Sequence, residues 1–296
     1  MSPPMKRQDA GGLDGSGGRS TSVSPFRATR EPALRKGPIA DEMHRPGFSG
    51  PLFSSVSDPF RSWESLTAAN PEPRALARLG LPAAVGTGVA AGAFDILRTR
   101  LSQGMEERGW TRLAITSPTH GCGKTFVAIH LAFGLARRPD SRTVLMDLEL
   151  RRPGLARTLE LDHAAPIRDF LTNEQPLESH FMRVGQSLAL CPNGTPVQDA
   201  AELLNDARTA EALDAMQDSL RPDLVLYDMP PALVCDDVIA FRPQIDAVLL
   251  VADGTRTTAD DIRRCERLFE DRIPLMGVVL NRAQDCGLSR YRYGRQ

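Results

Sequence analysis

The sequence predicts an α/β fold in which helices cover both faces of a mostly parallel sheet. Apolar runs of strand length recur from residue 112 to residue 281, and segments with helical spacing of apolar residues separate them. Strands buried on both faces read as continuous apolar runs, and their alternation with helices is typical of a parallel sheet. We therefore expect one doubly wound domain of about 200 residues.

The expected elements alternate along the chain. A helix over residues 93–109 comes first and places Phe94, Leu97 and Leu101 on one face. Strands are expected at residues 112–117, 143–148, 188–192, 224–229, 247–252 and 276–281. Helices are expected at about residues 124–138, 199–219 and 258–270. Such sheets bind ligands at the carboxyl ends of their strands, so we expect a site in the loops that follow the strands.

Residues 1–85 have a different composition. They are rich in Gly, Ser, Pro and Arg, as in "GGLDGSGGRSTS", and no apolar periodicity persists in them. Such a segment buries too little apolar surface to offset the entropy of ordering it, so we expect a disordered tail. Within it, "EPRALARLGL" (residues 72–81) is expected to be a fluctuating patch, with a helical turn or docking motif as the alternative. The folded domain is expected over residues 86–285 and a flexible tail over residues 286–296.

Composition narrows the classes of function. Charged residues make up 25% of the chain and the net charge is −1, which argues against a surface that binds nucleic acid throughout. The five cysteines form no CxxC pair, so neither a disulfide framework nor a zinc site is expected. Apolar runs are far shorter than the roughly 18–20 residues that span a bilayer. The N-terminus has no apolar core of a signal peptide, and a cytoplasmic protein is expected.

The stretch "TSPTHGCGKT" (residues 116–125) predicts a phosphate-binding loop between a strand and a helix. The pattern GxxxxGK[ST] calls for glycine where this chain has Pro118, so the loop belongs to a deviant Walker A class of P-loop NTPases. Lys124, the only lysine after residue 36, would reach the β- and γ-phosphates, and the Thr125 hydroxyl would bind Mg²⁺. The alternative is a glycine-rich helix cap. The residues expected to bind the nucleotide here are Gly121, Cys122, Gly123, Lys124, Thr125 and Phe126.

Two further segments place carboxylates after predicted strands. In "VLMDLELRRPGL" (residues 144–155), Asp147 and Glu149 can both approach a metal or a hydroxyl that must lose a proton. A solvated acidic turn is the alternative there. In "PDLVLYDMPPAL" (residues 222–233), apolar residues lead to Asp228, as in a Walker B strand that orients Mg²⁺. The expected Mg²⁺ ligands are Thr125, Asp147, Glu149 and Asp228.

These motifs resemble those of the bacterial tyrosine kinases of capsule and exopolysaccharide biosynthesis, which are related to the MinD/ParA-type ATPases. The resemblance rests on the three motifs above, with support from "AELLNDARTAEALDAM", "DAVLLVADGTRTT" and "GVVLNR", and covers roughly residues 90–285. It implies ATP and Mg²⁺ as cofactors. It also implies that Lys124 and Asp228 are catalytic, that Asp147 accepts the tyrosine proton, and that Glu149, where the family usually has aspartate, is its metal-side catalytic partner. Asn281 would contact adenine, with a helix cap as an equal alternative.

The chain departs from related patterns at two places. MinD/ParA-type loops carry a signature lysine at position 119, where this chain has Thr119, and the tyrosine kinases generally lack that lysine. The family pattern ExxRxxR, which builds a ring of subunits, aligns with Gly92, Asp95 and Arg98, so only the last arginine is kept. The first departure favours a kinase over a partitioning ATPase, and the second removes most of the usual ring motif.

Kinases of this family end in a tyrosine cluster that a neighbouring subunit phosphorylates. Tyr291 and Tyr293 lie in the final six residues, and the only other tyrosine is Tyr227 in a predicted strand; chance composition is the alternative. The resemblance implies an autophosphorylating tyrosine kinase that self-associates and regulates exopolysaccharide polymerisation and export. Its activator would be a transmembrane polysaccharide co-polymerase, or chain-length regulator, that recruits it to the inner face of the membrane. The alternatives are a MinD/ParA-like positioning ATPase and a catalytically weakened nucleotide-binding regulator.

Overall fold

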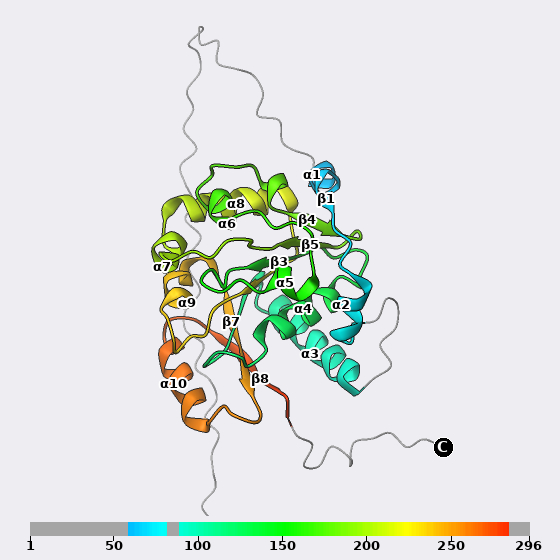
Figure 1. Cartoon of the computed structure of the whole chain (residues 1–296). Helices are drawn as coiled ribbons and strands as arrows, with labels where there is room; N and C mark the ends of the chain where they lie inside the picture. The colour runs from blue at the N-terminus through cyan, green and yellow to red at the C-terminus, as the bar shows by residue number, and fades with distance from the viewer. Residues whose placement is uncertain (1–58, 82–88, 284–296) are drawn as a thin grey trace, which may run out of the picture. The chain divides into compact units, whose positions relative to one another are not determined.

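The computed structural model describes residues 59–81 and 89–283. In this part of the chain, eight strands form one sheet in the order β1-β4-β5-β3-β6-β2-β7-β8, with helices on both faces (Figure 1). All neighbouring strands are parallel except β4 and β5, so the predicted mostly parallel, doubly wound sheet is confirmed. The strands are β1 (Thr67–Ala68), β2 (Arg112–Thr116), β3 (Thr143–Asp147), β4 (Met182–Val184), β5 (Leu188–Cys191), β6 (Leu224–Asp228), β7 (Ala247–Asp253) and β8 (Leu275–Asn281).

The helices alternate with the strands as expected. Each of the predicted strands is found to within one residue at each end. The helix predicted over residues 199–219 is instead two helices, because the Asp206 side chain accepts a hydrogen bond from the Arg208 N–H and starts a new helix there. The helices are α1 (Pro59–Ser65), α2 (Pro73–Arg78), α3 (Val89–Glu106), α4 (Lys124–Leu135), α5 (Leu155–Leu159), α6 (Ile167–Leu171), α7 (Ala200–Leu204), α8 (Ala207–Leu220), α9 (Asp237–Ala240) and α10 (Ala259–Phe269), with 3₁₀ turns η1 (Leu177–Ser179) and η2 (Arg242–Gln244).

The sheet has a hydrophobic core on each face. Successive residues of a strand point to opposite faces, so Leu145 of β3 joins the core under α3 and α4, whereas Val144 and Met146 join the core under α8 and α10. Burial on both sides explains why the central strands read as unbroken apolar runs. The carboxyl ends of β2, β3 and β6 are thereby fixed side by side.

Disorder was the wrong prediction for residues 59–81. Trp63 and Leu66 are buried in the core shared with α8, and β1 adds a parallel strand beside β4. The patch at residues 72–81 forms α2, where Ala75 is fully buried and the Leu79 carbonyl bonds to the ring of His130 at 2.8 Å. A few large apolar residues therefore order this segment although its average composition is polar. The remaining predicted tails, which include Tyr291 and Tyr293, lie outside the described residues.

Trp63→Ala is expected to lower the free energy of unfolding by about 3–5 kcal/mol, because it empties a site that is 4% exposed. It also removes the ring that the Arg142 guanidinium faces at 5.2 Å from the ring centre. Urea unfolding checks this, with the neighbouring exposed Glu64→Ala as the control. Equal midpoints for the two variants would show that α1 does not belong to the folded domain.

No helix within the described ranges combines the length and the apolar character needed to cross a bilayer.

Candidate functional site

The phosphate loop lies where the sequence predicts it, between the end of β2 and the start of α4. Gly121 and Gly123 have φ values of 78° and 88°, in the left-handed region that glycine adopts without steric cost. Gly123 is the N-cap of α4, so the loop leads directly into free N–H groups at a helix N-terminus. Together with Lys124, the first residue of α4, these groups form an anion site.

Three of the residues predicted to bind nucleotide have their side chains engaged elsewhere. The buried Cys122 thiol donates to the Thr119 carbonyl at 3.2 Å. The Phe126 ring packs against Phe94 of α3 and against His130, with ring centres 5.9 and 4.3 Å away, so only its backbone N–H is placed for a phosphate. Asn281 ends β8 and its amide donates to the Cys122 carbonyl at 2.8 Å, which makes it a brace for the loop rather than a helix cap. Its contact with adenine stays a prediction.

Asp147 and Asp228 lie side by side at the ends of two neighbouring strands. They are paired residues in the register of the parallel strands β3 and β6. Asp147 Oδ2 accepts hydrogen bonds of 2.9 Å from the backbone N–H groups of Gly154 and Leu155, and Asp228 Oδ2 accepts one of 2.5 Å from the Thr125 hydroxyl. The second oxygen of each carboxylate is buried and has no hydrogen-bond partner among the described residues.

Burial raises the pKa of both carboxyl groups. For Asp147 the charge of Asp228 adds to the rise, while the hydrogen bonds from Leu155 and Gly154 oppose it. For Asp228 the charge of Lys124 and the hydrogen bond from Thr125 oppose the rise. Two buried carboxylates side by side are costly without a cation, so their free oxygens form a favourable place for one.

This donor set fits Mg²⁺. Magnesium is commonly held by one or two carboxylates, a hydroxyl or water, and the phosphates of a substrate. Asp147, Asp228 and Thr125 supply the protein share of such a set. The described residues contain no cluster of three or more His, Cys, Asp or Glu side chains that would suit a dedicated all-protein metal site.

Glu149 lies beside the lysine of the phosphate loop. Its carboxylate forms an ion pair with the Lys124 ammonium group, and both side chains are less than a tenth exposed. His120 Nδ1 lies 4.0 Å from the other Glu149 oxygen. A buried ammonium group needs a counter-charge, and without a bound phosphate Glu149 provides it. Glu149 thus lies next to the lysine of the loop, and its role as the metal-side partner of Asp147 stays a prediction.

A hollow of about 430 Å³ opens beside the loop. Its walls come from the phosphate loop, from the segment after β3 and from the segment after β6, and include His120, Glu149, Arg152, Val234 and Asp236. The Val234 side chain is exposed on its rim. The hollow therefore adjoins the loop at His120 and the Lys124 partner Glu149.

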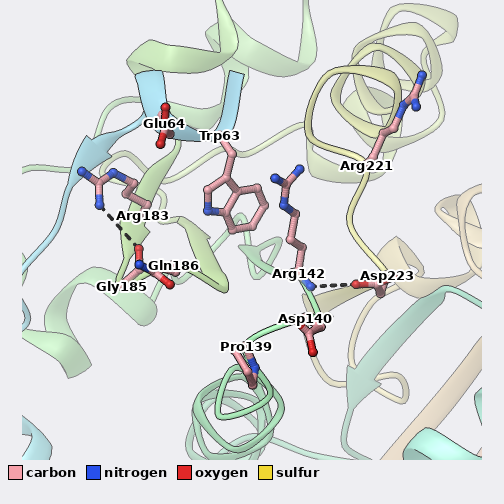
Figure 2. Close-up of a pocket in the computed structure, with 10 residues that line it drawn as sticks. All are labelled: Trp63, Glu64, Pro139, Asp140, Arg142, Arg183, Gly185, Gln186, Arg221 and Asp223. Carbon is pink, nitrogen blue, oxygen red and sulfur yellow. Dashed lines mark hydrogen bonds between the residues drawn. The ribbon is translucent and has the colours of Figure 1, made fainter. Parts of the chain in front are cut away.

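A larger hollow, of about 660 Å³, lies at the opposite edge of the sheet, where β3 and β6 begin (Figure 2). Figure 2 shows Trp63 between Arg183 and Arg142, and the Arg142 backbone N–H donates to Asp223 at 2.7 Å. Three arginines and three carboxylates line this hollow, so its charges offset one another. The residues that line it include no part of the glycine-rich loop.

Comparisons with known proteins agree with this arrangement, although no protein-family model matches the chain. EpsB of Ralstonia solanacearum is 32% identical over 204 residues, which cover 68% of this chain and 27% of EpsB. The kinase domain of the Escherichia coli tyrosine kinase ETK is 27% identical, with a TM-score of 0.61, over 70% of this chain and 80% of that domain. This domain is similar in sequence and in fold to the kinase domains of bacterial tyrosine kinases. The kinase domain of VpsO also superposes, at 25% identity and a TM-score of 0.58, over 66% of this chain and 97% of that domain.

The described domain corresponds to only part of the relatives that it matches. The chain spans about a quarter of the curated relatives it matches, 27% of EpsB and 28% of the E. coli tyrosine-protein kinase Etk.

Arg98, the residue kept from the ring pattern, makes its contacts within the domain. It donates to the Gly134 carbonyl of α4 at 3.2 Å and pairs with Asp95 at 3.5 Å. Arg137 of the α4–β3 connection also pairs with Asp95, at 3.0 Å, so these charges hold α3 against α4.

Proposed function

We propose that this domain is an ATP-dependent protein-tyrosine kinase that regulates exopolysaccharide or capsule polymerisation and export. The observation that carries the proposal is the Asp147–Asp228 pair, with its two free oxygens, next to a lysine-bearing phosphate loop. Phosphoryl transfer depends mainly on positioning and on neutralising charge, which this arrangement provides. The similarity to bacterial tyrosine kinases supports tyrosine as the residue that accepts the phosphoryl group.

Each side chain of the site would have a distinct task. Lys124 would exchange Glu149 for the β- and γ-phosphates, while the N–H groups of the loop bind the remaining phosphate oxygens. Asp228 and Thr125 would hold Mg²⁺ beside Asp147, and the ion would neutralise charge on the phosphates. The free oxygen of Asp147 would accept the proton of the tyrosine hydroxyl. The cation beside Asp147 would keep this buried carboxyl group ionised, and so able to accept that proton.

The acceptor and the partners follow from the family. Tyr291 and Tyr293 would be autophosphorylated on a neighbouring copy, entering through the hollow next to Glu149. A transmembrane polysaccharide co-polymerase would act as activator at the inner face of the membrane. Because Arg98 is engaged by α4, self-association would use contacts other than the usual ring motif.

The tail assignment predicts that Tyr291→Phe together with Tyr293→Phe removes nearly all phosphotyrosine and leaves ATP binding unchanged. The measurement is a phosphotyrosine blot of protein prepared with and without the cytosolic end of the co-polymerase, beside ATP titration. Tyr227→Phe is not a usable control because Tyr227 is fully buried, so each single tail variant serves instead. Phosphotyrosine that persists in the double variant would contradict the tail assignment alone.

The ion pair between Lys124 and Glu149 favours a second candidate, a nucleotide-binding regulator that does not transfer phosphate. In that protein the lysine would be neutralised before ATP arrives, and binding would end in a conformational signal. The same experiment separates the two. ATP binding without phosphotyrosine in every wild-type preparation would support the regulator and contradict the kinase.

A further inference from the structure

A network of charged side chains supports the phosphate loop from outside the motif. Asp253 ends β7, and its Oδ1 accepts hydrogen bonds from the Thr255 hydroxyl at 2.6 Å and from the Thr255 N–H at 2.9 Å. Its Oδ2 accepts bonds from Arg256 Nη2 at 3.1 Å and from Arg282 Nη1 at 2.9 Å. Asp253 is fully buried, whereas the side chains of Arg256 and Arg282 are 63% and 52% exposed. Both carboxylate oxygens are therefore saturated by donors.

The same two arginine nitrogens also bind the loop. Arg256 Nη2 donates to the Gly121 carbonyl at 3.2 Å, and Arg282 Nη1 donates to it at 2.8 Å. One residue further on, the Asn281 amide donates to the Cys122 carbonyl. Three side chains from the end of β8 and the β7–α10 loop thus hold two successive carbonyl groups of the phosphate loop.

Holding these carbonyls determines where the amides point. A peptide unit is planar and trans, so its N–H lies opposite its C=O. The Gly121 carbonyl therefore sets the direction of the Cys122 N–H, and the Cys122 carbonyl sets that of the Gly123 N–H. Glycines on both sides of Cys122 allow many other conformations, so the loop sequence alone does not select this one.

Asp253 is suited to hold the arginines. Hydrogen bonds from Thr255, and then from the two arginines, keep the pKa of Asp253 well below its usual range. It stays ionised and can orient both guanidinium groups through charge-assisted hydrogen bonds, which are stronger than neutral ones.

We propose that Arg256 and Arg282, oriented by Asp253, are positioning residues that keep the Cys122 and Gly123 N–H groups turned toward the nucleotide phosphates. This inference rests on the proposed nucleotide site and adds to it residues that lie outside the Walker motifs. It makes the end of β7 and the end of β8 part of the phosphate-binding machinery.

The test compares Arg256→Ala, Arg282→Ala and the double variant with the wild-type chain, with ATP and Mg²⁺ as the titrant. We expect about a tenfold loss of ATP affinity in the double variant, the scale of one or two lost hydrogen bonds. Arg282→Lys should bind ATP more tightly than Arg282→Ala does, because a single ammonium nitrogen can donate to both Asp253 and the Gly121 carbonyl. Arg263→Ala, which removes an α10 arginine paired with Asp260, is the control for charge alone.

Two further measurements separate positioning from other effects. The loss of ATP affinity in the double variant should persist at high ionic strength, where the long-range charge of an exposed arginine is screened. In protein without nucleotide, hydrogen exchange of the peptide covering residues 119–124 should be faster in the double variant and unchanged in Arg263→Ala. Wild-type affinity and wild-type exchange in the double variant would overturn the inference. Faster exchange in a chain whose wild type binds no ATP would overturn the nucleotide site and leave the loop support standing.

Discussion

Lys124→Met is expected to lower phosphoryl transfer by at least about 100-fold and also to destabilise the fold. Removing a preorganised group that stabilises transferring charge costs roughly 10²–10³ in rate. Since Lys124 and Glu149 are both buried, the variant also leaves Glu149 as an uncompensated charge, which costs about 3–5 kcal/mol. Phosphotyrosine blotting and urea unfolding measure the two effects.

The double variant Lys124→Met with Glu149→Gln separates the two effects. It should recover most of the lost stability, because no unpaired buried charge remains, and it should recover no transfer. His120, whose Nδ1 lies 4.0 Å from a Glu149 oxygen, provides a second check: His120→Gln should change stability little in the wild-type background. A Lys124→Met chain as stable as the wild type would show that the ion pair is not buried as described.

Asp147→Asn is expected to abolish transfer while making the nucleotide-free domain more stable at alkaline pH. The substituted side-chain amide keeps an oxygen to accept the N–H groups of Gly154 and Leu155 but lacks the charge that faces Asp228. The pKa of Asp147 is raised in the folded state, so its contribution to stability is present below the unfolded pKa. That contribution is lost as pH rises through the folded pKa. Between the pKa of Asp147 in the unfolded chain and its pKa in the folded domain, the free energy of unfolding of the wild type should fall relative to that of the variant. The fall should reach about 1.4 kcal/mol per pH unit.

Unfolding curves between about pH 4 and about pH 9, without nucleotide, test this expectation, because the pKa of Asp147 is raised to about 8 in the folded state. The exposed Asp140→Asn is the matched control and should follow the wild-type curve. Mg²⁺ should raise the free energy of unfolding of the wild type at high pH, because a cation between the carboxylates removes their repulsion. It should raise that of Asp147→Asn less. Parallel curves for wild type and Asp147→Asn would contradict the buried pair.

Local pattern was enough to predict much of this protein. The central strands carry side chains into two cores, so their apolar runs are continuous, and each was located to within one residue. The phosphate loop was also predictable, because the glycines, the lysine and the start of the following helix are consecutive in the chain. The position of Asp147 and Asp228 at one edge of the sheet also followed from a general property of parallel sheets, in which ligands bind at the carboxyl ends of the strands.

Other features depended on residues far apart in the chain. Disorder was predicted for residues 59–81 from average composition, whereas Trp63 and Leu66 find their burial against a core made by later residues. Phe126 was expected to bind the nucleotide for its position in the motif. Its ring instead packs against Phe94 of α3, a residue outside that motif.

Neighbouring residues and the periodicity of buried strands were sufficient to predict the sheet, the phosphate loop and the presence of carboxylates after strands. Which side chains meet within the site depends instead on the assembled fold. It pairs Lys124 with Glu149, aligns Asp147 with Asp228 in the register of β3 and β6, and brings Arg282 to Gly121 across a separation of 161 residues. Strand order and register set these contacts, and both depend on how the whole sheet assembles.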